Sequence, residues 1–171
     1  LLFKTSDATW QAYNKYGGNS FYTGTVAGYT AGRAVKISYN RPFTTREDRE
    51  DWLFWSEYPM IRWLERNGYS MKYTTDVDME RTALDLSKFN VFLSVGHDEY
   101  WSANERNNVE NARNNGKHLA FFSGNEVYWK TRWETSIDGS NTPTRTLVCY
   151  KEGTSGENAC VGKCDPTSTW T

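Results

Sequence analysis

Two short apolar segments, each followed at once by a polar turn, set the strongest constraint on what this chain can fold into. Residues 90–95 (NVFLSV) and 118–123 (HLAFFS) have the length and mostly apolar character of strands inside a parallel sheet. Between them, Ser102-Ala103-Asn104-Glu105 has the pattern of a capping box, which starts a helix, and Gly116 ends that helix. This order predicts two parallel strands joined by a right-handed helical crossover.

The segments before residue 90 extend the same alternation of strands and helices. Residues 69–74 predict a strand, and residues 76–89 predict a connection with a short helix. Residues 1–5 and 34–39 predict two further strands, the second with alternating apolar side chains. We therefore expect an α/β fold with a doubly wound, mostly parallel sheet flanked by helices.

Residues 47–67 have the pattern of a helix that is interrupted once. Acidic residues crowd its start, where they interact favourably with the helix dipole. Because Pro59 lies inside the segment, the pattern predicts either two helices or one kinked helix. Ser56 is a candidate cap for the second half, and Gly68 ends it.

The ends of the chain predict a piece of a longer protein. The sequence opens with Leu1-Leu2-Phe3, as if inside a strand, and closes on Trp170-Thr171 without a helix cap or a polar tail. We expect one domain over residues 1–152 and a tail containing Gly, Ser and Cys over residues 153–171. Further domains of the same longer chain are the expected partners.

The three cysteines favour an oxidising compartment. Cys160 and Cys164 lie in the tail and Cys149 in a strand-like segment, so a disulfide within the tail is the simplest interpretation. A zinc site has weaker support, because the chain has neither a CxxC pair nor a nearby histidine. We expect an extracellular or cell-surface location, with the cytoplasm as the alternative.

Charge and hydropathy exclude several classes of partner. With a net charge of −1, the chain has no electrostatic basis for binding nucleic acid or an anionic membrane. No apolar run approaches the roughly 20 residues of a membrane-spanning helix. The aromatic content of 16% is explained either by core packing or by a pocket for a partly apolar ligand. The remaining expectation is a small-molecule substrate, and the sequence leaves a homo-oligomer open.

Two polar turns follow the two buried strands, and both are candidate parts of a functional site, because open parallel sheets bind ligands beyond the carboxyl ends of their strands. Gly96-His97-Asp98-Glu99-Tyr100 follows the first strand and Gly124-Asn125-Glu126 the second, and Tyr39 could join them. His97 exchanges protons near neutral pH, and Glu99 could act as a base or a metal ligand. The competing interpretation is that the acidic residues only serve the start of the next helix.

The residue types of this site favour a metal ion over a covalent mechanism. The chain has no GxSxG elbow, no GxGxxG motif and no P-loop, and its cysteines lie in the last part of the sequence. Carboxylate, phenol, amide and imidazole groups remain. This set suits a metal ion with oxygen ligands.

Four segments form a pattern that occurs together in one known family. They are residues 9–14 (TWQAYN), 38–42 (SYNRP), 96–102 (GHDEYWS) and 123–129 (SGNEVYW). The pattern resembles the C-terminal domain of the large (beta) subunit of N,N-dimethylformamidase and its relatives. The resemblance covers residues 1–152, and the strand–GHxEYWS–helix motif is its most specific part.

The resemblance implies a fold of the flavodoxin or class I glutamine amidotransferase type, without the catalytic cysteine of those amidotransferases. It also implies a mononuclear iron that hydrolyses a small amide. Glu99 matches the glutamate ligand, and Tyr13 and Tyr39 match the two tyrosine ligands. His97 matches a nearby catalytic histidine, and Asn125 matches an asparagine on the substrate side.

Two positions depart from the family pattern. Asp98 stands where the family has proline, and Glu126 where it has glycine. The carboxylate of Glu126 joins His97 and Asn125 in the candidate catalytic set. An added negative charge there would change the substrate or abolish catalysis.

Two functions from different classes follow. The first is a metal-dependent hydrolase of a small amide, or of a related substrate with a C–N bond, in which His97 passes a proton to the departing amine. The alternative is a secreted, non-catalytic module that uses the same fold for binding or for building a cell-surface structure. In that case Tyr13 and Tyr39 only cover the end of the sheet.

Overall fold

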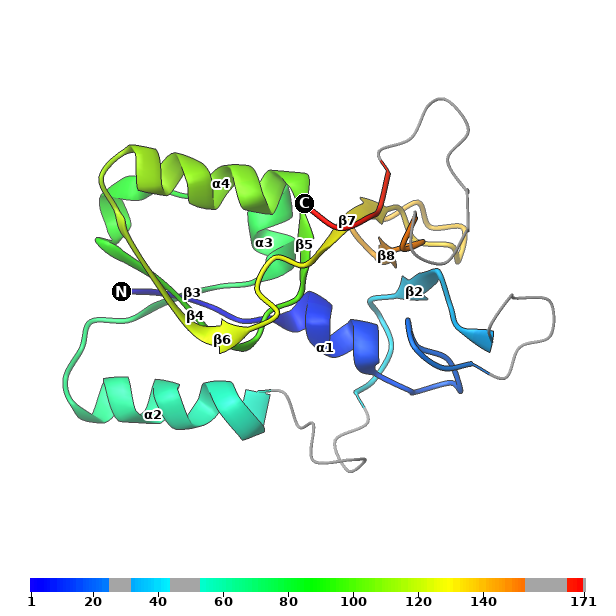
Figure 1. Cartoon of the computed structure of the whole chain (residues 1–171), viewed down its shortest axis with the longest axis horizontal. Helices are drawn as coiled ribbons and strands as arrows, with labels where there is room; N and C mark the ends of the chain where they lie inside the picture. The colour runs from blue at the N-terminus through cyan, green and yellow to red at the C-terminus, as the bar shows by residue number, and fades with distance from the viewer. Residues whose placement is uncertain (25–31, 44–52, 153–165, 171) are drawn as a thin grey trace.

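The computed structural model of the chain describes residues 1–24, 32–43, 53–152 and 166–170. Its centre is a four-stranded parallel sheet in the order β3 (Lys72–Thr74), β1 (Leu2–Lys4), β4 (Val91–His97) and β6 (His118–Gly124). Because β1 pairs with both β3 and β4, the first residues of the chain lie inside the sheet (Figure 1). The strand and helix order predicted for residues 69–123 is confirmed.

Helices cover both faces of the parallel sheet (Figure 1). They are α3 (Asp76–Arg81) and α4 (Ala103–Asn114) on one face and α2 (Tyr58–Arg66) on the other, with a 3₁₀ turn (Leu86–Lys88) after α3. Met79 and Val109 pack with Phe92 in the core on the first face. Leu64 packs with Leu93 on the second face. The α/β class with a parallel sheet is therefore confirmed.

A second, mixed sheet lies beside the parallel one. Its order is β2 (Lys36–Ser38), β8 (Thr146–Val148), β7 (Trp129–Glu134) and β5 (Tyr100–Ser102), with β5 and β7 parallel and the other pairs antiparallel. Helix α1 (Asp7–Tyr13) packs against it through Ala8 and Ala12. The strand predicted at residues 34–39 therefore belongs to this sheet, so it does not end at the edge where β4 and β6 end.

The helix termini confirm one prediction and correct another. Ser102 and Glu105 form the predicted capping box at the start of α4. Ser56 does not cap α2, because a π-helical turn (Leu53–Glu57) continues directly into that helix and Glu57 occupies the cap position. Residues 44–52, which hold the acidic start of the predicted helix, lie outside the described residues.

The last described residues return to the domain. The Tyr150 amide donates to the Thr167 hydroxyl at 2.7 Å, and Thr169 forms a bridge with Trp129. Cys149 is buried and carries a free thiol, while Cys160 and Cys164 lie outside the described residues. Among the helices of the described part, none is long and apolar enough to cross a membrane.

Candidate functional site

A glycine near the end of β4 allows the chain to turn into the candidate site. Gly96 has a φ of +93°, which favours glycine. A Cβ atom at this position would lie 2.3 Å from the Ser56 hydroxyl oxygen and 3.1 Å from the Ser56 Cβ. A side chain at Gly96 would therefore push the turn before α2 away from the sheet.

The buried carboxylate of Glu99 is the centre of a cluster of hydroxyl groups. The Tyr13 hydroxyl donates to its Oε2 at 2.7 Å, and the Tyr22 hydroxyl lies 3.0 and 3.1 Å from its two oxygens. The Tyr100 hydroxyl donates in turn to the Tyr22 hydroxyl at 2.6 Å. His97 Nε2 lies 3.3 Å from Glu99 Oε2. Three side chains thus converge on one carboxylate that is only 4% exposed, and Tyr100 supports one of them.

Helix α1 fixes the backbone of this turn as well as its side chains. The buried Thr9 hydroxyl accepts hydrogen bonds from the amides of Glu99 and Tyr100, at 3.0 and 3.3 Å. One helical turn later, α1 presents Tyr13 to the Glu99 carboxylate. A single short helix therefore sets both the position and the partner of Glu99.

Burial keeps the phenols of the cluster protonated. Removal from water raises the pKa of Tyr13 most, and the hydrogen bonds and charge of its neighbours Tyr22 and Glu99 raise it further. Burial also raises the pKa of Tyr22. Both phenols are therefore neutral at pH 7 in the absence of a cation, and both hold Glu99 through their protons.

The oxygens of this cluster fit a metal ion. A cation that takes the place of the phenolic protons of Tyr13 and Tyr22 would meet two phenolate oxygens and the carboxylate of Glu99. These are hard, anionic donors of the kind that a highly charged iron ion prefers. The positive charge would also compensate the burial that otherwise opposes ionisation of the two phenols.

The second tyrosine at Glu99 is Tyr22, where the sequence predicted Tyr39. The Tyr39 ring packs edge-on against Trp133, with ring centres 4.9 Å apart. Its hydroxyl is buried and has no hydrogen-bond partner in the described part of the chain. The structure therefore brings Tyr13 and Glu99 together as predicted and does not bond Tyr39 to them, while the choice of metal ligands stays a prediction.

The turn after β6 adjoins the turn after β4, as the sequence predicted. The amides of Tyr128 and Trp129 donate to the Glu99 carbonyl at 3.0 and 2.9 Å. Asn125 is exposed at the tip with a φ of +51°. Glu126 accepts a hydrogen bond from Ser123, and burial is the main cause that raises its pKa to about 7. Proton exchange by Glu126 near neutral pH is therefore possible.

Lys151 lies beside the cluster and was not identified in the sequence. Its ammonium group is 3.8 Å from the ring centre of Tyr22 and 4.9 Å from that of Trp129. These are cation–π distances, and burial lowers the pKa of Lys151. In the sequence, Lys151 only follows a strand-like segment that ends in Tyr150, which does not distinguish it from other lysines.

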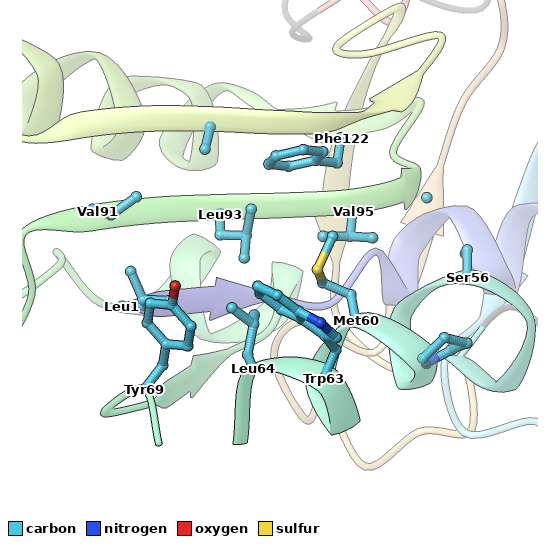
Figure 2. A pocket seen from close by; sticks show the side chains of 13 residues that line it. Leu1, Ser56, Met60, Trp63, Leu64, Tyr69, Val91, Leu93, Val95 and Phe122 are labelled. Atoms are coloured by element: carbon cyan, nitrogen blue, oxygen red, sulfur yellow. The ribbon is translucent and has the colours of Figure 1, made fainter. Parts of the chain in front are cut away.

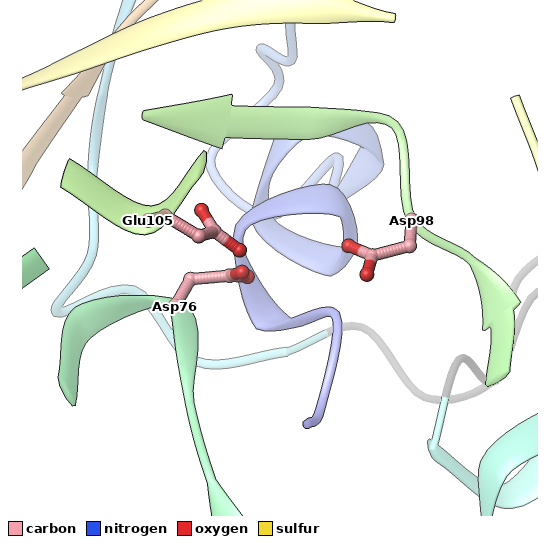
Figure 3. A group of neighbouring side chains, drawn as sticks. All are labelled: Asp76, Asp98 and Glu105. Atoms are coloured by element: carbon pink, nitrogen blue, oxygen red, sulfur yellow. The ribbon is translucent and has the colours of Figure 1, made fainter. Parts of the chain in front are cut away.

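Asp98 is fully buried and belongs to a separate group of charges with Asp76 and Glu105 (Figure 3). Lys4 Nζ lies 2.5 Å from carboxylate oxygens of Asp76 and Asp98 and 2.6 Å from one of Glu105. The three carboxylates are close enough together to hold a metal ion, but the Lys4 ammonium group already supplies the cation. Burial alone would lower the pKa of Lys4, and the three carboxylates instead hold it well above its usual value. Through Asp98, this group of charges holds the turn that follows β4.

Comparison with known proteins agrees with the motifs of this site. Residues 1–170 match the family described as "N,N-dimethylformamidase beta subunit-like, C-terminal". The N,N-dimethylformamidase beta subunit of Paracoccus aminophilus is 28% identical over 113 residues, an alignment that covers 61% of this chain and 15% of that protein. The chain thus spans a small part of that relative. Because the family match covers nearly the whole chain, this protein belongs to the family of N,N-dimethylformamidase beta subunit-like C-terminal domains.

Proposed function

We propose that this chain forms part of a metal-dependent hydrolase that cleaves the C–N bond of a small amide or a related substrate. The observation that carries the proposal is the convergence of Tyr13, Tyr22 and His97 on the buried carboxylate of Glu99. The relative from P. aminophilus is named as an N,N-dimethylformamidase subunit, which supports an amide as the substrate class. A class I glutamine amidotransferase-like arrangement belongs to the same proposal, as do further domains or chains that complete the enzyme.

Iron is the metal we propose, with Tyr13, Tyr22 and Glu99 as the residues that would hold it. Bound iron would polarise the amide carbonyl and make a water molecule more acidic. Tyr39 is the alternative phenol, because its buried hydroxyl has no hydrogen-bond partner among the described residues. Bulk water has little access to the carboxylate, because Glu99 is only 4% exposed.

The remaining polar residues would handle substrate and protons. His97 is partly exposed and lies 3.3 Å from Glu99, so its imidazole can carry a proton from the buried cluster to the departing amine. Asn125, in the adjoining turn, would orient the carbonyl of the substrate. Glu126 would exchange a proton with water at neutral pH.

A non-catalytic binding module is the second candidate. It is favoured by Lys151, whose ammonium group already brings a positive charge to the face of Tyr22, and by the packing of Tyr39 against Trp133. In this case the hydroxyl cluster is a structural hydrogen-bond network that closes the end of the sheet. An extracellular or cell-surface location would suit this candidate.

Metal analysis of the purified chain distinguishes the two candidates. We expect about one iron per chain by mass spectrometry, and loss of iron in Glu99→Gln, which keeps the shape of the side chain and removes its charge. Glu110→Gln, a half-buried change on α4 at a residue that has no contact with Glu99, is the matched control and should keep the metal. Absence of metal from both the unaltered chain and the control, after reconstitution with ferrous and ferric iron, would reject the hydrolase proposal.

A further inference from the structure

The edge strand β6 has a hollow on each face of the sheet. On the α2 face, a cavity of about 710 Å³ is lined by Ala120 and Phe122 together with residues of α2 and β4 (Figure 2). On the α4 face, a cavity of about 340 Å³ is lined by Leu119 and Phe121. Successive side chains of one strand therefore line two cavities on opposite faces.

The same strand is apolar and exposed. Phe121 is 43% and Phe122 is 63% exposed, and Trp63, across the larger cavity, is also exposed. β6 pairs with β4 on one side, and no other strand of the described residues pairs with its free edge. An apolar free edge of this kind readily accepts another strand. The side chains of an added strand would alternate between the two cavities.

We propose that a second copy of this chain supplies that strand, through antiparallel pairing of β6 with β6 of the partner. A two-fold axis at Phe121 pairs all seven residues of the strand with one another. It places Ala120 opposite the partner's Phe122 on the α2 face, so a small side chain meets a large one. On the other face the two Phe121 rings meet at the axis, where aromatic pairs stabilise a sheet.

Charges at the two ends of β6 favour self-pairing in the antiparallel direction. Lys117 comes immediately before the strand, and Glu126 follows its end by two residues. Antiparallel pairing brings Lys117 of each copy towards the partner's Glu126 and favours the ionised form of that carboxyl, whereas parallel pairing would bring the two Lys117 side chains together. Such an interface is self-complementary and closed, as two-fold dimers require. The inference does not depend on the proposed hydrolase activity.

Charge exchange at the axis tests this arrangement directly. Sedimentation equilibrium of the complete chain should show a dimer. Phe121→Lys and Phe121→Glu should each be monomeric, because each variant places two like charges side by side on the two-fold axis. An equimolar mixture of the two variants should restore a dimer. Tyr16→Lys, which changes a similarly exposed aromatic beside β2, should remain dimeric.

Two results would overturn the proposal. One is a monomeric wild-type chain at about 100 μM, which is above the micromolar Kd at the weak end of standard-size interfaces. The other is a dimer that both charged variants retain. If circular dichroism shows that the charged variants do not fold, Phe122→Ala decides. We expect at least about tenfold weaker dimerisation from it, because it removes a ring buried in the partner's cavity, and unchanged affinity would reject the interface.

Discussion

The hydroxyl groups of Tyr13 and Tyr22 contact Glu99, whereas that of Tyr39 does not. Tyr22→Phe removes an oxygen that lies 3.0 Å from Glu99, so we expect it to weaken iron binding by at least about tenfold, because loss of even an outer partner of a metal ligand costs that much. Tyr39→Phe, the matched control, should leave iron affinity unchanged. Titration of the metal-free chain with ferric iron, followed by its phenolate-to-iron absorption, measures both. The reverse order of effects would restore Tyr39 as the ligand.

Glu57 should make the stability of the fold depend on pH. Its carboxyl group is fully buried and accepts hydrogen bonds from Ser6 and Trp10, and burial raises its pKa to about 7. The folded chain therefore keeps this proton up to about pH 7, whereas the unfolded chain releases it near pH 4.5. Stability should fall as the pH rises through this window, by on the order of 3 kcal/mol.

Comparison of Glu57→Gln with the unaltered chain tests this pH dependence of stability. Glutamine cannot ionise and still offers an oxygen to Ser6 and Trp10, so the free energy of unfolding in urea should vary less between pH 5 and pH 8 than in the unaltered chain. Glu110→Gln, at a half-buried carboxyl on α4 that pairs with Arg106, should change the pH dependence much less. Parallel curves for Glu57→Gln and the unaltered chain would contradict the assignment.

Site residues could be predicted from the sequence only where they follow a recognisable strand. His97 and Glu99 were recognisable because they follow a buried strand, where side chains of a parallel sheet meet ligands. Tyr22 lies in a Gly- and Thr-rich loop without any periodic pattern, and only its long-range contact with Glu99 assigns it to the site. Lys151 is likewise placed by contacts with distant rings.

The charged group beneath the turn after β4 links four elements of the fold. Lys4 comes from β1, Asp76 from α3, Asp98 from the turn and Glu105 from α4. Lys4→Met would leave three buried carboxylates without their cation, and we expect a loss of about 3–5 kcal/mol in the free energy of unfolding. Chemical denaturation measures it, with the exposed Lys36→Met as the control. A loss below about 1 kcal/mol would mean that the carboxylates take up protons at little cost.

One hydroxyl group of helix α1, that of Thr9, holds the backbone of the site in place. Thr9→Val keeps the shape of the side chain but leaves the buried amides of Glu99 and Tyr100 without their acceptor. We expect a loss of about 1–3 kcal/mol in stability. Thr142→Val, an exposed change, should cost little. Equal stability of the two variants would show that water or a backbone shift replaces the hydroxyl.

At the scale of elements, the parallel sheet was predictable and the mixed sheet was not. Residues 90–95 and 118–123 are long enough to carry an apolar pattern, and the helix between them has a recognisable cap. β2, β5 and β8 have three residues each, and β2 pairs with β8 across more than a hundred residues, as Ile37 with Leu147. Such pairs follow from tertiary packing alone. The apolar sequence of β6 predicted a buried strand. Because β6 lies at the edge of the sheet, its side chains Phe121 and Phe122 are exposed.

In the whole molecule, the two sheets share elements and should unfold together. Strand β1 leads directly into α1, which packs on the mixed sheet, and β4 leads through the turn into β5. Unfolding followed by far-ultraviolet circular dichroism and by tryptophan fluorescence should therefore give one midpoint. Separate midpoints would show that the mixed sheet is an independently stable unit.

The buried group around Lys4 also limits how this chain can change over evolution. Loss of the lysine alone leaves three buried carboxylates without a cation. Loss of a single carboxylate leaves the buried ammonium group with less opposite charge around it. The four positions are therefore expected to be replaced in concert, so that related chains with an apolar residue in place of Lys4 also lack most of its carboxylate partners.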